Sequence, residues 1–180
     1  KIMLTSRKAA DLEEAAAHLQ AKGIDTRWIA ADASDAEQVH KVCRETLERI
    51  GHVDILVNNA GAAWGAPAED HPLEAWDKVM NLNVRSIFLF SQAIGKASMI
   101  PRKKGRIINI ASVAGMKIVP QLSVYSMSKA AVIHMTRALA AGSDRCWVSA
   151  ARVMLESCAM ARKSRRSSWS KFMHELNHHR

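Results

Sequence analysis

The chain has 180 residues, 48% of them hydrophobic and 24% charged, which is typical of a globular protein and suits one domain with a single sizeable core. No apolar run approaches the roughly 20 residues of a membrane-spanning helix, so a membrane protein is not expected. We do not expect the start to be a signal peptide, because its apolar run is short and a charged segment follows at once. The chain opens on Lys1 within a strand-like run, so we expect further residues upstream.

Cysteine content and charge narrow the function classes further. The three cysteines form no Cys-x-x-Cys pair and no even framework, which argues against disulfides and structural zinc and favours a reducing cytoplasm. The net charge of +9 is concentrated near the end of the chain, where residues 142–180 carry eight Lys and Arg against three Asp and Glu. The basicity is therefore largely a property of this last segment.

Strand-like and helix-like segments alternate along the chain. The predicted strands are residues 1–7, 24–34, 53–61 and 105–112, and the predicted helices are residues 8–23, 34–51, 72–99 and 124–141. Gly23 and Gly51 stand where helices usually end, and Ser34 with Glu37 forms a capping box at the start of the second helix. Within the predicted strand 53–61, residues 55–57 are apolar without interruption, which is typical of a parallel strand covered on both faces.

This alternation predicts an α/β fold, a doubly wound parallel sheet in a Rossmann-like three-layer αβα arrangement. In such folds ligands bind beyond the carboxyl ends of the strands. Asn58–Gly61 and Ser112 lie at two such ends, so polar residues gather where the fold places its crevice. Past residue 141 the sequence shows no strand pattern. We therefore predict two regions, a partial Rossmann-type domain over residues 1–141 and a basic tail of doubtful order over residues 142–180.

Tyr125, the only tyrosine of the chain, precedes Lys129 by one helical turn. This spacing puts both side chains on one face of the helix. A free phenol has a pKa near ~10, and a fixed ammonium beside it lowers that pKa and suits the phenol to proton transfer. Ser112, at the end of the preceding strand, is placed to put a hydroxyl beside the same substrate oxygen. The set suits interconversion of an alcohol and a carbonyl, although a Tyr-x-x-x-Lys pair by itself is usually a solvated helix face.

Four segments together resemble the classical short-chain dehydrogenases/reductases. They are DILVNNAG (54–61), MNLNVRSIF (80–88), GRIINIASVAG (105–115) and YSMSK (125–129), in the order and spacing of that family. The resemblance covers about residues 1–141 and lies near bacterial enzymes acting on sugar acids, polyols or keto-acyl thioesters. It implies an NAD(P)-dependent oxidoreductase that interconverts an alcohol and a carbonyl by hydride transfer.

The resemblance also implies roles for individual residues. Tyr125 matches the catalytic acid/base, and Lys129 matches the lysine that lowers the tyrosine pKa and binds the nicotinamide ribose. Ser112 matches the serine that holds the substrate oxygen. Asn83 matches the asparagine that anchors a proton-relay water; Asn81 is an alternative, but NVRSIF aligns the later residue.

Cofactor-binding residues are implied at the ends of several strands and on the Tyr/Lys helix. They are Ser6, Arg7, Asp32, Ala33, Asn59, Ala60, Gly61, Tyr125 and Lys129. The strand that ends in Thr5-Ser6-Arg7 carries no carboxylate that would repel a 2′-phosphate, and it ends in one guanidinium. This favours NADP, with NAD as a possible alternative, although a loop arginine is often only solvated.

Two parts of the family pattern have no counterpart in the sequence. The family opens with a strand and a glycine-rich turn that cradles the pyrophosphate, and in the usual strand order 3-2-1-4-5-6 this strand lies between the second and the fourth. Its absence leaves two apolar edges unpaired. The strands that follow the Tyr/Lys helix are also missing. The alternative to an oxidoreductase is therefore an inactive fragment or frame-shifted remnant with at most a binding or interaction role.

Other signals are weaker. Residues 174–178 match the zinc-protease pattern H-E-x-x-H but lie in a polar tail with no evident third ligand, so we expect no metal site. The basic cluster 161–171 fits a solvated tail better than a nucleic-acid site. We expect a small alcohol or ketone as substrate, and a homo-oligomer formed through the apolar faces of helices 84–99 and 124–141.

Overall fold

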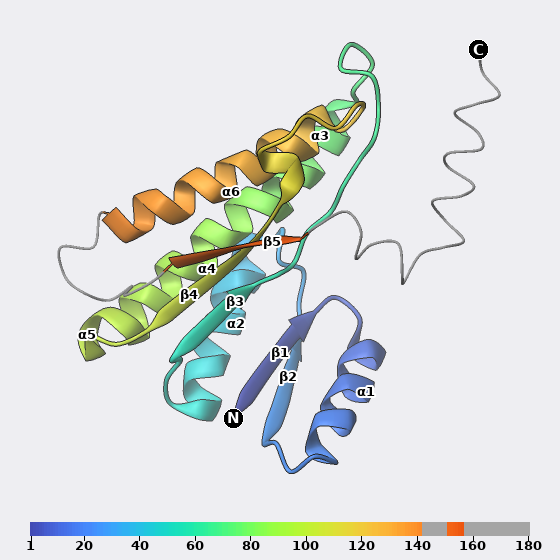
Figure 1. Cartoon of the computed structure of the whole chain (residues 1–180). Helices are drawn as coiled ribbons and strands as arrows, with labels where there is room; N and C mark the ends of the chain where they lie inside the picture. Colours follow the sequence, from blue (N-terminus) through green and yellow to red (C-terminus); the bar gives the residue numbers. More distant parts are fainter. Residues whose placement is uncertain (142–150, 157–180) are drawn as a thin grey trace.

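The computed structural model describes residues 1–141 and 151–156 (Figure 1). The strands are β1 (Ile2–Ser6), β2 (Thr26–Ala30), β3 (Ile55–Asn58), β4 (Arg106–Ser112) and β5 (Ala151–Glu156). The α-helices are α1 (Ala9–Gln20), α2 (Ala36–Ile50), α3 (Leu73–Met80), α4 (Ser86–Ile94), α5 (Ile100–Arg102) and α6 (Ser123–Ala141). Two π-helical turns, η1 (Asn81–Arg85) and η2 (Gly95–Met99), join α3, α4 and α5 into one long helical segment, and a 3-10 turn, η3 (Val113–Gly115), follows β4.

Gly51 is confirmed as the C-cap of α2, whereas α1 ends at Gln20 with Ala21 as its C-cap, three residues before Gly23, and the predicted capping box is wrong. Gly23 and Gly51 both have positive φ, +77° and +84°, the backbone conformation that favours glycine after a helix. At the start of α2 the N-cap is Asp35, whose carboxylate accepts the backbone N–H of Glu37 at 2.9 Å and that of the next residue at 3.3 Å. Ser34 does not cap because its hydroxyl donates to Asp32 instead, at 2.7 Å.

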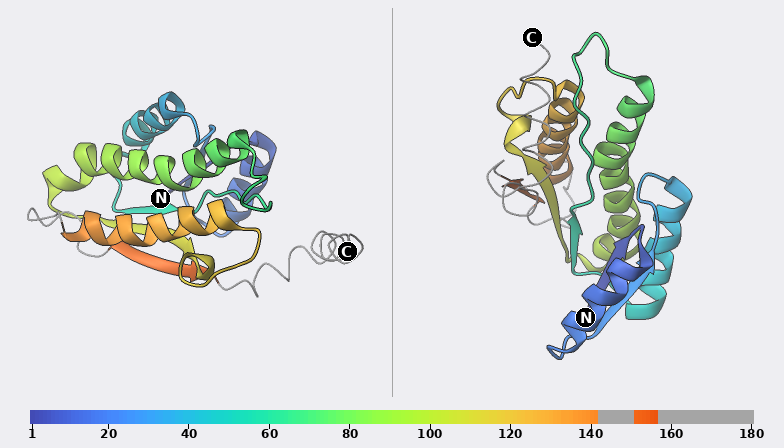
Figure 2. Two further views of the ribbon diagram at one scale, coloured as in Figure 1. Left: turned by 90° about the horizontal axis from the view of Figure 1, so that it is seen from above. Right: turned by 90° about the vertical axis from the view of Figure 1, so that its right-hand side faces the viewer.

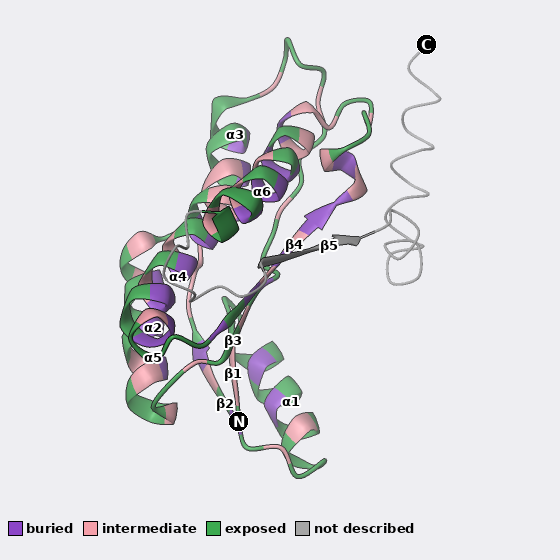
Figure 3. Ribbon diagram, turned by 60° about the vertical axis from the view of Figure 1, so that its left-hand side comes forward, coloured by how far each residue is buried: buried purple, intermediate pink, exposed green. Residues whose placement is uncertain are grey.

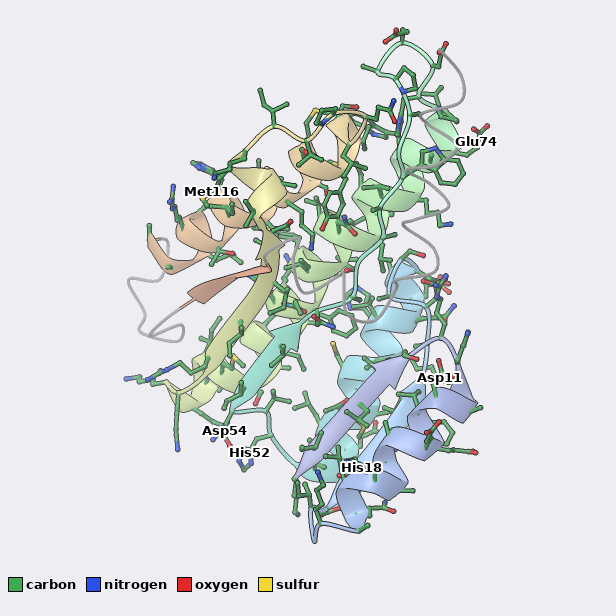
Figure 4. All side chains as sticks on the ribbon, turned by 45° about the vertical axis from the view of Figure 1, so that its right-hand side comes forward. Asp11, His18, His52, Asp54, Glu74 and Met116 are labelled. Carbon is green, nitrogen blue, oxygen red and sulfur yellow. The ribbon has the colours of Figure 1, made fainter. Side chains whose placement is uncertain are left out.

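The strands form two parallel sheets, β2–β1 and β3–β4–β5. β1 and β3 point the same way in Figure 4 but do not pair with each other. In the usual order of a doubly wound sheet one further strand lies between these two positions. No strand of the described residues occupies it. The predicted fold class, a doubly wound α/β sheet without the family's first strand, is confirmed.

Helices cover the strands on two sides. The main core joins α2 and α4 to β2 and β4, and a second cluster joins α4 and α6 to β4. These helices therefore share one face of the strands, whereas α1 lies on the other side of the β1–β2 pair (Figure 2). The buried surface of α4, α6 and β4 faces inward, toward these contacts (Figure 3). None of the described helices combines the length and the apolarity that crossing a membrane requires.

β3 departs from the prediction that it is covered on both faces. Leu56 packs against the main core, but Ile55 and Val57, which point to the opposite face, are 59% and 53% exposed. The reason is local: β3 has no partner on the side toward β1, and no helix of the described residues covers Ile55 and Val57. An uninterrupted apolar run therefore forms a strand here with one solvated face.

β5 lies in the segment where the sequence shows no strand pattern. It pairs in parallel with β4, from Ile107 opposite Ala151 to Ser112 opposite Glu156. The prediction that no strand follows residue 141 is therefore wrong for these six residues. A short apolar run inside polar sequence gives little periodic signal, and it forms a strand because an edge of β4 is available to pair with it. The rest of the predicted tail, residues 142–150 and 157–180, lies outside the described residues.

Candidate active site

The candidate residues follow the carboxyl ends of parallel strands. Ser6 ends β1, Asn58 ends β3 and Ser112 ends β4, while Asp32 stands two residues after β2. Because parallel strands present their carboxyl ends on one side, Ser6 and Asp32 share that end of the β1–β2 sheet, and Asn58 and Ser112 share that end of the β3–β4–β5 sheet. β1 and β3 point the same way, so the two ends face the same side of the molecule (Figure 4). The carboxyl edge is therefore the place where the described fold gathers its polar groups.

Lys129 is fixed against the end of β4. Its side chain lies on the buried face of α6, and the residue is only 5% exposed. The Nζ atom donates a hydrogen bond to the carbonyl oxygen of Ile110 at 2.8 Å and lies 5.8 Å from the centre of the half-buried Tyr125 ring. The predicted pairing of these two side chains on one helix face is thus present, with the ammonium held by a backbone group.

Asn83, in the π-helical turn η1, joins the loop after β3 to α6. Its Oδ1 accepts the backbone N–H of Ala62 at 2.8 Å, and its Nδ2 donates to the carbonyl of the same residue at 2.9 Å. The second Nδ2 proton goes to Ser128 Oγ, also at 2.9 Å. Asn83 is fully buried. A π-helical turn commonly marks a functional position, and here it is where this inward-pointing amide sits.

Two glycines lie where these parts come close, and at one of them, Gly115, the close approach requires glycine. A Cβ on Gly61 would lie 3.4 Å from Asn83 Oδ1 and 3.6 Å from Lys129 Nζ, so the loop after β3 runs directly past both side chains. A Cβ on Gly115 would lie 2.7 Å from the carbonyl carbon of Lys129 and 2.9 Å from the Ala130 nitrogen. Because the neighbours of Gly115 are backbone atoms, η3 can lie against α6 only without a side chain there.

Ser112 connects β4 to this group. It is buried, ends the strand and opens η3, where its Oγ accepts the backbone N–H of Ala114 at 3.2 Å. Ile110, whose carbonyl accepts the hydrogen bond from the Lys129 ammonium, lies two residues earlier on the same strand. The turn that Ser112 opens ends at Gly115, which packs against the backbone of Lys129. Strand and turn thereby tie Ser112 to the Lys129 segment of α6.

A buried polar network braces the strands beneath the carboxyl edge. Asn58 Nδ2 donates to Asn109 Oδ1 at 2.8 Å and approaches Ser91 Oγ at 3.4 Å. Asn109 Nδ2 in turn donates to Thr136 Oγ1 at 2.9 Å. The network links β3, β4, α4 and α6, and satisfied buried networks of this kind rigidify a core.

The cofactor side of the predicted site is polar and partly exposed. Asp32 accepts hydrogen bonds from the Ser34 hydroxyl at 2.7 Å and from its backbone N–H at 2.9 Å. These bonds, and then the charge of Arg7, lower the pKa of the Asp32 carboxyl from its usual value of 3.8. Arg7 and Asp32, from the ends of two neighbouring strands, are therefore close enough to interact electrostatically. Ala33 packs partly buried against the main core.

Sequence reasoning missed several residues of this arrangement. Asn109, Gly115 and Ser128 were given no role of their own. A signal was present for Asn109, a lone amide inside a strand that is otherwise apolar, and for Ser128, a small hydroxyl on the buried face between Tyr125 and Lys129. For Gly115 the sequence offers only its place in a turn, since the reason for the glycine is a contact with a distant helix.

Other titratable groups lie away from the carboxyl edge. Figure 4 shows His52 and Asp54 just before β3, at the end opposite Met116, and His52 Nε2 lies 3.2 Å from Asp54 Oδ2. The described residues contain no group of three or more His, Cys, Asp or Glu that could hold a metal ion. The H-E-x-x-H match at 174–178 and the basic cluster at 161–171 lie outside the described residues.

Comparison with known proteins decides the family. Residues 1–166 match the sequence profile described as short chain dehydrogenase. The chain belongs to the short-chain dehydrogenase family. Gluconate 5-dehydrogenase of Gluconobacter oxydans (strain 621H) is 33% identical over 140 residues, which are 78% of this chain and 54% of that protein. The chain thus spans about half the length of the curated relatives it matches.

Solved structures of the family share this fold. A gluconate 5-dehydrogenase from Burkholderia cenocepacia J2315 in complex with NADP and tartrate superposes with a TM-score of 0.81 at 27% identity, covering 93% of this chain and 68% of that one. An NAD⁺-bound xylitol dehydrogenase gives a TM-score of 0.81 at 29% identity, covering 86% of this chain and 59% of that one. These two proteins of similar fold are both dehydrogenases, one crystallised with NADP and the other with NAD⁺.

Proposed function

We propose that this chain carries the catalytic part of an NAD(P)-dependent oxidoreductase that interconverts a small alcohol and the corresponding carbonyl compound. The observation that carries the proposal is the buried Lys129 ammonium, held by Ile110 at 2.8 Å beside the Tyr125 ring. A positive charge fixed in a partly desolvated place stabilises a neighbouring phenolate more than a mobile, solvated one would.

Tyr125 is the proton donor and acceptor of this proposal. In the direction of reduction its phenol gives a proton to the oxygen of the carbonyl substrate, and in oxidation its phenolate takes the proton from the alcohol. The Lys129 ammonium stabilises the phenolate and so lowers the pKa of the phenol, which allows proton transfer near neutral pH. Ser112 Oγ orients the substrate oxygen by a hydrogen bond. Asn83, which is hydrogen-bonded to Ala62 in the loop after β3, takes the role of the asparagine that anchors a proton-relay water.

The residues at the carboxyl edge fit a nicotinamide cofactor. Gly61 lies beside Asn83 and Lys129, since a Cβ built on it would be in van der Waals contact with Asn83 Oδ1 at 3.4 Å and with Lys129 Nζ at 3.6 Å. Arg7 and Ser6 at the end of β1 suit the adenosine side, with Asp32, Ala33, Asn59 and Ala60 on the neighbouring loops. When bound, the cofactor supplies or accepts the hydride. The exposed Arg7 guanidinium favours a 2′-phosphate and thus NADP, with NAD as the alternative.

Partners and location follow from the same proposal. Phe88 on α4 and Met127 on α6 are 43% and 46% exposed, which supports association of two copies through helices 84–99 and 124–141.

Among the described residues Cys43 is a free, buried thiol, and its burial raises its pKa to about 12, as suits an inert thiol in a reducing cytoplasm. The division into a domain over residues 1–141 and a basic tail stays a prediction.

Cofactor binding tests the proposal directly. NADPH and NADH are titrated separately into the purified full chain, and binding is followed by the change in nicotinamide fluorescence. We expect saturable binding, tighter for NADPH, and weaker NADPH binding by Arg7→Ala with NADH binding unchanged. An Arg27→Ala variant is the control, because Arg27 is an exposed arginine of β2 that contacts the carbonyl of Arg49, away from the carboxyl edge. Failure to bind either nucleotide contradicts the proposal.

A second function is favoured by one observation. β1 and β3 have no common neighbour among the described residues, and Ile55 and Val57 are exposed beside the resulting edges. Unpaired parallel edges bind further strands. A catalytically inactive protein that associates through these edges is therefore the alternative, and it predicts no nucleotide binding in the same titration.

A further inference from the structure

We infer that Ser128 is a positioning residue that fixes the Tyr125 turn of α6 to the loop after β3. The inference rests on the proposed role of Tyr125 as the proton-transferring group. Ser128 Oγ donates to the carbonyl oxygen of Tyr125 at 2.7 Å and accepts a proton from Asn83 Nδ2 at 2.9 Å. One hydroxyl thus touches both the helical turn that carries the phenol and the amide that holds Ala62.

The chain of bonds is continuous from the loop to the tyrosine. Asn83 binds both backbone groups of Ala62, at 2.8 and 2.9 Å, and this pairing determines which end of its amide is oxygen. With that end fixed, the remaining Nδ2 proton can go only toward Ser128. Both Nδ2 protons and the hydroxyl proton are then used.

Burial makes this link stiff. Asn83 and Ser128 are both fully buried, at 0% exposure. In a low-dielectric interior hydrogen bonds are stronger, and a group that loses its partner is costly, so the arrangement has little freedom to rearrange. Removal of the Ser128 hydroxyl leaves one Asn83 proton without an acceptor and removes the side-chain hydrogen bond to the Tyr125 carbonyl. The turn bearing the phenol is then held less firmly against the loop after β3.

The same helix offers a matched control. Thr136, about two turns further along α6, repeats the arrangement: Oγ1 donates to the Val132 carbonyl at 2.7 Å and accepts from Asn109 Nδ2 at 2.9 Å. It is 1% exposed. Thr136→Val therefore removes two hydrogen bonds of the same kind from the same helix and leaves one proton of the Asn109 amide without an acceptor. Neither of these bonds involves the Tyr125 turn.

The test compares Ser128→Ala with Thr136→Val in the full chain. Because Tyr125 is the only tyrosine, tyrosine labelled at the ζ carbon of the ring gives one NMR resonance that reports its surroundings without cofactor or turnover. We expect both variants to lower the melting temperature by a similar amount, about 4 °C. Only Ser128→Ala is expected to shift and broaden the Tyr125 resonance. It should also lower kcat by about tenfold to a hundredfold with KM little changed, because the phenol is misplaced in the reacting state.

Each outcome decides the inference. A Tyr125 resonance that moves equally in both variants, or in neither, overturns it, because Ser128 would then be an ordinary core hydroxyl. If Ser128→Ala does not fold, Ser128→Cys keeps a side chain of similar size with a weak donor, and the same resonance is expected to shift by a smaller amount. An absence of cofactor binding and turnover in the wild type would contradict the proposed function instead, and it leaves the resonance comparison intact.

Discussion

The Lys129 ammonium lies 5.8 Å from the centre of the Tyr125 ring, and the carbonyl of Ile110 holds it there by a hydrogen bond of 2.8 Å. The helix supplies the spacing of the two side chains, and the end of β4 supplies the anchor. A lysine that could otherwise swing into solvent is thereby kept beside the phenol. This is the relationship on which the proposed proton transfer depends.

Replacement of the phenol is the simplest prediction. Tyr125→Phe removes the transferable proton but keeps the ring, so we expect turnover to fall by about 10²–10⁴ while the fold and nucleotide binding are retained. Steady-state rates with nucleotide titrations measure this. The neighbouring Ser126, whose buried hydroxyl has no hydrogen-bond partner within the described part of the chain, provides the control, since Ser126→Ala should leave the rate unchanged. Comparable rates for Tyr125→Phe and the wild type would exclude Tyr125 as the proton donor.

Gly115 tests whether close packing of η3 on α6 builds the site. Gly115→Ala places a Cβ 2.7 Å from the Lys129 carbonyl carbon, and backbone cannot yield as a side chain can, so the turn must move away. We expect a loss of about 1–3 kcal/mol in the free energy of unfolding and a lower rate, because Ser112 moves with the turn. Met116→Ala, at an exposed neighbouring position, is the control. Chemical denaturation and steady-state kinetics that do not distinguish the two variants would contradict this account.

Asp32 predicts a dependence of stability on pH. Hydrogen bonds from Ser34 lower the pKa of the folded-state carboxyl below 3.8, so their stabilisation is fully present above the unfolded-state pKa and is lost as the pH falls through the folded-state value. Wild type should therefore be more stable than Asp32→Asn at neutral pH, and the difference should vanish in acid. Urea denaturation across that range measures the effect. Ser34→Ala, which removes the main donor, should weaken the pH dependence, and equal acid sensitivity of wild type and Asp32→Asn would contradict the assignment.

The uncovered face of β3 predicts association between copies of the chain. Ile55 and Val57 are more than half exposed beside an unpaired edge, an arrangement that favours pairing with another chain. Ile55→Lys or Val57→Lys should reduce concentration-dependent association measured by sedimentation. Ile118→Lys is the control, because Ile118 is 97% exposed in the loop after η3 and lies on no strand. This variant should leave the association unchanged. A drop in association with Ile118→Lys alone would place the contact elsewhere.

Much of this fold could be predicted from the sequence because its elements are locally encoded. Apolar runs and a helix-ending glycine such as Gly51 act within a few residues, and the motif around Tyr125 and Lys129 fixes their spacing on one helix. The family's strand order also predicted the unpaired position between β1 and β3.

The remaining features depend on contacts between distant segments. β5 forms because β4 offers an edge, and Gly115 is required because η3 lies against α6. Asp35 rather than Ser34 caps α2, since Asp32 already engages the Ser34 hydroxyl. None of these partners is visible in a local pattern. The role of Ser128 likewise depends on Asn83, which lies far from it in the sequence.

The most direct measurement of the central claim is the titration of Tyr125 itself. The chain has one tyrosine, so the phenolate absorbance or the single NMR resonance of tyrosine labelled at the ζ carbon follows this group alone as the pH is raised. We predict that the phenol of the wild type titrates well below the ordinary value of ~10, and that Lys129→Met moves the midpoint back toward ~10 while Lys117→Met, at an exposed lysine, does not. A wild type that titrates near ~10, at the same pH as Lys129→Met, would contradict the account.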